Sequence, residues 1–399
     1  MAKLIEITGK ALAGEWGTDD ESGEGIPVLR TTNFTNEGTV DYNNVVTRTI
    51  IKKNLEEKYL RAGDIIIEKS GGSDKQPVGR VVYFDGPENT YLFNNFTGLL
   101  RVKEQTKWFP KYVFYSLYGN YRRGGTRPFE NKTTGLHNLK TDGYVSRYEV
   151  AETSFSKQVE ISSQLDKLHS TIKMREDEII KLDDLIRARF VEMFGDPIQN
   201  PKGWDMPLIE DVVANEKNAL KAGPFGSALK KEYYVASGYK IYGQEQVISG
   251  DCTFGDYYID EERYKSLENC AIQPGDVLIS LVGTYGKLLV IPEVFEPGII
   301  NPRLMKITFD KEKVNPYYFK FFFQSESLKK ALSENTHGGT MDILNLGIVR
   351  KIEMPLPPLK LQNEFVDFVY QVDKSKAAVQ KSLDETQMLF DSLMQKYFG

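Results

Sequence analysis

The chain has 399 residues, and its 51 Lys and Arg against 56 Asp and Glu give a net charge of −5. With 27% charged and 12% aromatic residues it is not a disordered chain, and at about 150 residues per domain it predicts two or three domains. Two cysteines, Cys252 and Cys270, are too few for a disulfide framework or a cysteine-based zinc site. Neither a signal-peptide core nor a membrane-spanning run is found, so we expect a cytoplasmic protein. Taken alone, the acidic balance argues mildly against a nucleic-acid partner.

The sequence repeats itself. Phe194-Gly195 returns as Phe398-Gly399 and Leu4–Glu6 returns as Leu208–Glu210, both 204 positions later (398 less 194, and 208 less 4). These matches predict two copies, 1–195 and 205–399, joined by a Pro- and Gly-rich linker at 196–204. Weaker matches between the copies relate LRAGDIII (60–67) to IQPGDVLI (272–279), GIPVLR (25–30) to GYKIYG (238–243), and 99–102 to 304–307.

Each copy is expected to open with a strand-rich body and to close with a long helix. Apolar, β-branched runs bounded by Gly, Asp or Pro predict strands at 64–67, 79–84, 276–282 and 288–291. Aromatic segments that begin with Pro predict helices at 110–118 and 316–323. We therefore expect the following α+β organisation: a first mixed α/β domain at 1–150, a helix at 151–195, a linker at 196–204, a pseudo-symmetric second domain at 205–356 and a helix at 357–399.

Apolar residues recur every four, then three, positions in both closing segments. The first seam contains Ile161, Leu165, Leu168, Ile172, Ile179, Leu182, Ile186 and Met193. The second contains Phe365, Val369, Val372, Val379, Leu383, Phe390, Leu393 and Tyr397. This spacing is typical of a coiled coil, although an amphipathic helix lying on its own domain is the alternative. We favour an antiparallel pair that separates the two bodies by about 50 Å at 1.5 Å per residue, which suits two DNA half-sites over one turn apart.

The motifs of common active sites are missing. No dinucleotide fingerprint, His-Glu-x-x-His helix or Gly-x-Ser-x-Gly elbow occurs, and GTYGK (283–287) has too few residues between its glycines for a phosphate loop. His137, His169 and His337 do not cluster in the sequence. We therefore expect no catalytic residue and no metal site.

Polar, Gly-rich segments, which we expect to form loops, are the candidates for DNA contact. They lie at 68–76, 122–138 and 217–234, with counterparts of the first two at 280–287 and 337–345. Glycine permits close backbone approach, Lys and Arg meet phosphate, Arg also pairs guanine, and Asn pairs adenine. A solvated surface side chain is the alternative at each position. The candidates are Lys69, Ser70, Gly71, Gly72, Ser73, Lys75, Arg122, Arg123, Arg127, Asn131, Lys132, His137, Asn138, Lys221, Ser227, Lys230, Lys231, Tyr285, Lys287, His337, Thr340 and Asn345.

Charge is distributed unevenly between the bodies. Residues 1–150 hold 21 basic and 19 acidic residues, a net +2, whereas 199–356 hold 18 and 21, a net −3. Because phosphate neutralisation drives most non-specific affinity, such a chain would bind DNA weakly alone. A partner that brings positive charge would resolve this.

Several segments resemble the specificity subunit of Type I restriction–modification systems. They are GIPVLRTTN (25–33), LRAGDIII (60–67) with SGGS (70–73), PVGRVV (77–82), MFGDP (193–197), and MPLPPL (354–359) followed by Gln362. The first-copy counterpart of the Pro-rich element, VAETSF (150–155), has lost its prolines, which leaves that boundary open.

The resemblance implies two target-recognition domains, each of which reads half of a bipartite DNA site, and an antiparallel coiled coil that fixes the gap. It also implies a host-defence complex with two adenine-N6 methyltransferase subunits, which use S-adenosylmethionine, and with restriction subunits, which use ATP and Mg²⁺. This chain would supply specificity without catalysis or a cofactor of its own. Two rival hypotheses are a coiled-coil scaffold whose bodies bind proteins and a self-contained DNA enzyme.

Overall fold

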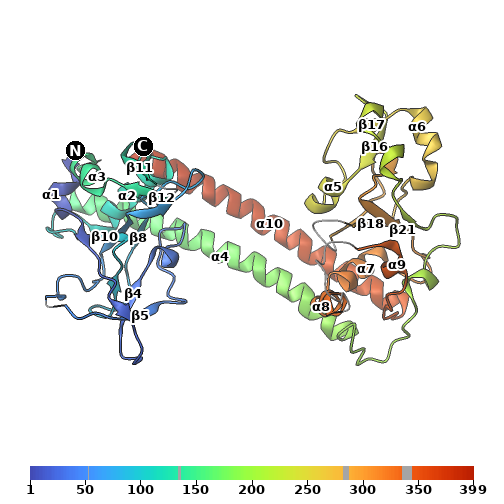
Figure 1. Ribbon diagram of the computed structural model, residues 1–399, viewed down its shortest axis with the longest axis horizontal. Helices are drawn as coiled ribbons and strands as arrows, with labels where there is room; N and C mark the ends of the chain where they lie inside the picture. The colour runs from blue at the N-terminus through green and yellow to red at the C-terminus, as the bar shows by residue number, and fades with distance from the viewer. Residues whose placement is uncertain (53, 134–135, 282–286, 335–343) are drawn as a thin grey trace. The chain divides into compact units, whose positions relative to one another are not determined.

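The computed structural model describes residues 1–52, 54–133, 136–281, 287–334 and 344–399. It divides into two compact units, unit 1 (Met1–Asp177 with Gln380–Gly399) and unit 2 (Glu178–Val379). The two long helices, α4 (Phe155–Phe194) and α10 (Leu359–Phe398), each contribute residues to both units (Figure 1). In the described part of the chain, no helix has the length and apolar character needed to cross a membrane.

Unit 1 is built on two four-stranded sheets. The central sheet runs in the order β2 (Leu12–Ala13), β10 (Thr97–Leu100), β6 (Ile65–Glu68), β8 (Val81–Tyr83). The second sheet runs in the order β3 (Thr18–Asp19), β5 (Val46–Thr49), β4 (Ile26–Leu29), β9 (Leu92–Phe93), with β4 and β9 parallel. Smaller pairings join β1 (Ala2–Lys3) to β13 (Glu149–Val150), and β11 (Glu130–Thr133) to β12 (Leu136–Leu139) and β7 (Ser70–Gly72). The helices are α1 (Leu4–Thr8), α2 (Pro110–Arg122) and α3 (Thr141–Arg147).

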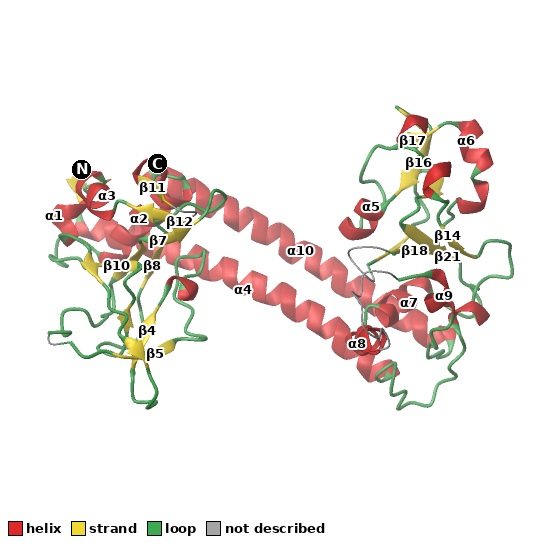
Figure 2. Cartoon of the chain, viewed as in Figure 1, coloured by secondary structure: helices red, strands yellow, loops and turns green. Residues whose placement is uncertain are grey.

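Unit 2 repeats this topology. Its central sheet runs in the order β14 (Leu220–Ala222), β21 (Leu304–Ile307), β18 (Val277–Ser280), β19 (Leu288–Val290). Its second sheet runs in the order β15 (Tyr234–Val235), β17 (Tyr258–Ile259), β16 (Tyr239–Tyr242), β20 (Gly298–Ile300), with β16 and β20 parallel. The helices are α5 (Gln244–Ser249), α6 (Glu261–Ser266), α7 (Pro316–Phe323), α8 (Glu326–Glu334) and α9 (Leu346–Arg350) (Figure 2). The predicted α+β class and its pseudo-symmetry are confirmed.

The strongest internal sequence match forms the same turn twice. Gly63 and Gly275 both have positive φ, +96° and +85°, where glycine is favoured, and each precedes a buried aspartate. Asp64 accepts a hydrogen bond from the backbone N–H of Arg61 at 2.8 Å. Asp276 accepts one from Gln273 at 3.0 Å. Asp64 also pairs with Arg101, which directly follows β10, and Asp276 pairs with Lys306 of β21, so the turn fixes the start of β6 and of β18.

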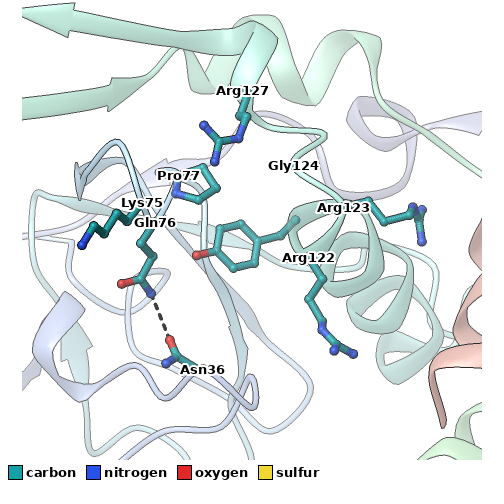
Figure 3. A pocket seen from close by; sticks show the side chains of 9 residues that line it. Asn36, Lys75, Gln76, Pro77, Arg122, Arg123, Gly124 and Arg127 are labelled. Carbon is teal, nitrogen blue, oxygen red and sulfur yellow. Dashed lines mark hydrogen bonds between the residues drawn. The ribbon is translucent and has the colours of Figure 1, made fainter. Parts of the chain in front are cut away.

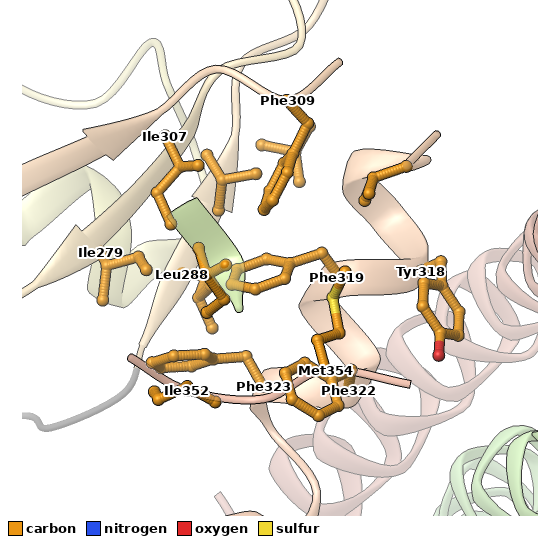
Figure 4. Close-up of a cluster of buried hydrophobic side chains, with 14 of the residues drawn as sticks. Ile279, Leu288, Ile307, Phe309, Tyr318, Phe319, Phe322, Phe323, Ile352 and Met354 are labelled. Atoms are coloured by element: carbon orange, nitrogen blue, oxygen red, sulfur yellow. The ribbon is translucent and has the colours of Figure 1, made fainter. Parts of the chain in front are cut away.

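Aromatic helices cover one face of each central sheet. In unit 2 the buried rings of α7 pack against aliphatic side chains of β18, β19 and β21 (Figure 4). These rings belong to Tyr318, Phe319, Phe322 and Phe323. In unit 1, α2 does the same with Tyr112, Phe114 and Tyr115. Rings of this size dominate core stability because each buries a large apolar area.

The helix segments in each unit are antiparallel. In unit 1 the Tyr397 hydroxyl donates to Gln164 at 3.4 Å, and His169 lies 6.3 Å from the Phe390 ring. The residue number rises on α4 as it falls on α10, which is the antiparallel order. Unit 2 has the same order, because Asp183 lies 2.5 Å from the ammonium of Lys376 and the Phe190 ring lies 5.4 Å from the Phe365 ring. Within this pairing, all the apolar residues predicted for the two seams are buried or half-buried.

A buried glutamine joins each long helix to the aromatic helix of its unit. Gln362 accepts a hydrogen bond from the backbone of Asn315 at 2.8 Å and donates to Lys313 and Pro357 carbonyls at 2.9 and 2.8 Å. Gln158, 204 positions earlier (362 less 158), makes the same three bonds in unit 1. The repeat is thus preserved at the level of single hydrogen bonds, which in both units contact the residue directly before the aromatic helix.

Candidate nucleic-acid interface

In unit 1, three chain segments leave the central sheet at one edge. The strands β2 and β6 end at the side of the sheet where β10 and β8 begin. This follows from the strand register, which pairs Gly98 with Ala13, Thr97 with Glu68, and Ile67 with Val81. The segments Gly14–Trp16, Lys69–Arg80 and Asn94–Phe96 form what we call the loop edge of unit 1. A Cβ atom at Gly14 would lie 2.1 Å from the carbonyl oxygen of Asn94, so glycine lets two of these segments touch.

Two of the predicted polar segments meet in a small sheet. Ser70–Gly72 is strand β7, which pairs with β12, and β12 pairs with β11. The predicted residues Ser70, Gly71, Gly72, Asn131, Lys132, His137 and Asn138 therefore lie on adjacent strands, and the hydroxyl of Ser70 bonds the side chain of Asn138. We expected these segments to be loops. They lack hydrophobic alternation, but backbone pairing between positions far apart in sequence makes them strands.

A basic pocket of about 530 Å³ lies beside this sheet, lined by Lys75, Arg122, Arg123 and Arg127 (Figure 3). Two of these arginines are already engaged. Arg122 forms an ion pair with Asp391 at 2.7 Å, and Arg123 donates to the carbonyl of Phe398. Lys75 and Arg127 are exposed and have no carboxylate partner within the described residues. Their charges are therefore the ones available to a phosphate group.

His137 is enclosed by acidic side chains. Its Nδ1 lies 3.3 Å from Glu130 and its Nε2 lies 3.7 Å from Asp74, while Glu130 also accepts the Val78 N–H at 2.9 Å. The histidine is buried, so its contacts hold the 73–78 turn against β12. Next to this sheet, burial raises the pKa of Glu68, and Arg80 partly offsets the effect at 3.2 Å. Across the described ranges, no group of three His, Cys, Asp or Glu could hold a metal.

Unit 2 has a matching loop edge. The register pairs Ala222 with Met305, Ser280 with Leu304, and Ile279 with Leu288, so β14 and β18 end where β21 and β19 begin. We call Gly223–Tyr233, Leu281 with Lys287, and Asn301–Arg303 the loop edge of unit 2. A Cβ atom at Gly223 would lie 1.9 Å from the Asn301 carbonyl oxygen, the same close approach as at Gly14.

The predicted residues of unit 2 differ in their exposure and in their contacts. Lys221 is half-buried in β14, whereas Ser227, Lys231 and Lys287 are exposed. Lys230 is exposed and lies 3.5 Å from Glu232. The side chain of Asn345 caps α9 by accepting the Ile348 N–H at 3.0 Å. Tyr285, His337 and Thr340 lie outside the described residues. In unit 1, Lys69 is half-buried and Ser73 is exposed.

Sequence reasoning missed several residues at these edges. Arg303 is exposed at the start of β21, and Gln244 opens α5 beside it. Phe225 is 89% exposed. The guanidinium carbon of Arg48 lies 4.2 Å from the centre of the Trp16 ring. No local signal marks these residues, because only the pairing of distant strands brings them to the edge.

Two solved structures share the fold over 100% of this chain. The S subunit of a Type I restriction–modification system from M. genitalium has a TM-score of 0.57 at 14% identity, over 95% of that chain. A chain from a study of complex assembly and conformational transition of the type I R-M system has a TM-score of 0.60 at 15% identity, over 96% of that chain. The fold is therefore that of Type I S subunits.

Two sequence comparisons agree with the fold. Residues 201–386 match the family model of the Type I restriction modification DNA specificity domain. The specificity subunit of the Type I restriction enzyme MjaVIII from Methanocaldococcus jannaschii is 21% identical over 178 residues. That alignment spans 43% of this chain and 40% of the relative. The chain therefore carries a Type I restriction–modification DNA specificity domain, and the predicted resemblance is confirmed.

Proposed function

We propose that this chain is the DNA specificity subunit of a Type I restriction–modification complex and that each unit reads one half of a bipartite site. The repeated loop edge carries this proposal. In both units, matching segments project from the corresponding strand ends of the central sheet, and the long segment of unit 1, 69–80, is polar and Gly-rich. A recognition element that is present twice in one chain fits a site with two separated halves.

The candidate DNA contacts divide by chemistry. Lys75 and Arg127 in unit 1 supply charge for phosphate groups, and the glycines of β7 allow the backbone to approach the duplex. The pair formed by Ser70 and Asn138 presents polar atoms suited to base edges. The remaining predicted residues stay candidates, with Arg122 and Arg123 assigned to holding α10 against unit 1.

The net charge of −5 favours a complex in which partners supply positive charge. We propose that two adenine-N6 methyltransferase subunits dock on the paired helices, enclose the DNA and carry S-adenosylmethionine and the chemistry. Restriction subunits that use ATP and Mg²⁺ would join them in the cytoplasm. In this arrangement the chain has no catalytic step, and α4 and α10 set the unread gap. Target-recognition domains at 1–150 and 205–356 and the linker at 196–204 complete the proposal.

The test is selection of DNA by the assembled complex. The full chain is purified with the methyltransferase subunit of its host and incubated with a random duplex pool, and retained DNA is sequenced. We expect two fixed half-sites separated by a constant gap, and no consensus with the methyltransferase alone. Absence of sequence selectivity would favour the scaffold hypothesis. Methylation of DNA by this chain alone with S-adenosylmethionine would favour the enzyme hypothesis.

A further inference from the structure

Arg303 is held rigidly at the loop edge of unit 2. Its backbone N–H donates to the Asn301 side chain at 2.9 Å, and its carbonyl accepts from Leu281 at 2.9 Å. Asn301 itself donates from its backbone to Tyr242 at 2.9 Å. The residue is therefore fixed between the two sheets of the unit, while its side chain is exposed.

The guanidinium group is oriented by a neutral partner. Its Nη1 donates to the Gln244 side-chain oxygen at 3.3 Å, and the Gln244 amide donates to the Ser280 hydroxyl at 2.9 Å. Gln244 opens α5 and Ser280 ends β18, so both anchors lie on regular elements. A side chain held in this way loses less conformational entropy when it binds a ligand.

Among the described residues, no carboxylate compensates the charge of Arg303, which distinguishes it from three other arginines that the structure holds in place. Arg48, Arg80 and Arg101 each pair with a carboxylate, at up to 3.2 Å. Within the described part of the chain, Arg303 has no carboxylate partner, and its Nε and Nη2 have no acceptor. These two N–H groups lie in the plane of the guanidinium group and suit a ligand that offers two neighbouring hydrogen-bond acceptors. Guanine presents O6 and N7 in this manner in the major groove.

We propose that Arg303, positioned by Gln244, is a specificity-determining residue that reads a guanine in the half-site of unit 2. This inference rests on the proposed function and assigns a base contact within it. The equivalent position in unit 1 is Phe96, because the bond from Leu281 to the Arg303 carbonyl corresponds to the bond from Lys69 to the Phe96 carbonyl. Phe96 is 51% exposed and has no donor in its side chain. The loop edge of unit 1 therefore lacks this donor at the matching position.

The experiment repeats the DNA selection with three variants of the full complex. Arg303→Lys keeps the charge but loses the fork, and Gln244→Leu keeps Arg303 but releases its guanidinium. Arg350→Lys is the control, because Arg350 is exposed at the end of α9 and has no ion-pair partner in the described ranges. We expect Arg303→Lys to lower discrimination at one base pair of one half-site by between about 5-fold and 100-fold. Gln244→Leu should affect the same base pair, and Arg350→Lys none.

Three other outcomes are informative. Unchanged discrimination in Arg303→Lys would overturn the inference. A fourth variant, Arg303→Gln, would then identify Arg303 as a phosphate contact if it weakened binding to all sequences alike. Loss at base pairs of both half-sites would overturn it as well. If the unsubstituted complex yields no consensus, the proposed function itself fails, and the inference fails with it.

Discussion

Replacing Gln362 by Met tests the hydrogen bonds that join α10 to the body of unit 2. Methionine has a similar length and shape but no polar side-chain atoms. The change removes three hydrogen bonds, from the Asn315 N–H and to the carbonyls of Lys313 and Pro357. Gln362 is fully buried, so water cannot replace these bonds. At about 1 kcal/mol for each net hydrogen bond, unit 2 should lose about 3 kcal/mol of unfolding free energy.

Calorimetry measures this loss. For a domain of this size, about 3 kcal/mol corresponds to a fall in Tm of roughly 6 to 12 °C. Gln371→Met is the matched control, since Gln371 lies on the same helix with its side chain exposed, and it should change stability by less than about 0.5 kcal/mol. Equal Tm values for the two variants would refute the view that the buried glutamine holds the helix to the unit.

Three further predictions concern pH, salt and spacing. Hydrogen bonds from Lys52 and Lys58 hold the pKa of Glu15 below its ordinary 4.5, so its contribution to stability is present above about pH 4.5 and is lost as pH falls through the lowered pKa. Urea titrations between pH 3 and 6 should therefore show a weaker acid dependence for Glu15→Gln, and identical curves would contradict the role of this pair. Arg127→Ala should reduce the salt dependence of DNA binding by the complex by about one phosphate contact, as measured by fluorescence anisotropy. A similar reduction in Arg122→Ala would contradict the assignment of Arg122 to the ion pair with Asp391. Inserting seven residues into both α4 and α10 should lengthen the unread gap by about 3 base pairs and leave both half-sites unchanged, and altered half-sites would refute the spacer.

Periodic features were predictable from the sequence. The strands around Ile65–Glu68 and Val277–Ser280, the Pro-initiated helices and the two seams depend on local composition and hydrophobic spacing, which a single sequence displays. The repeat was predictable because short identical segments recur at a constant offset. The pairing of the helices was chosen over a lone amphipathic helix because both stripes lie in one chain. The contacts within each unit agree with that choice.

The candidate site was predicted less well. The 68–76 segment was recognised as polar and Gly-rich, but its pairing with Leu136–Leu139 depends on contacts between distant residues. Arg122 and Arg123 looked available for DNA, and their partners Asp391 and Phe398 lie more than 260 positions away. Arg303 and Gln244 belong to no motif and meet only through the sheet. Composition therefore indicated the kind of surface, while strand order decided which side chains form it.

Genome-wide mapping of methylated adenine tests the central claim most directly. The methyltransferase subunit is expressed with and without this chain in a host that lacks other adenine methylation, and the DNA is sequenced at single-molecule level. The account predicts one split motif with a constant gap, methylated only when the chain is present. Methylation without a split motif, or the same motif in the absence of the chain, would contradict the account.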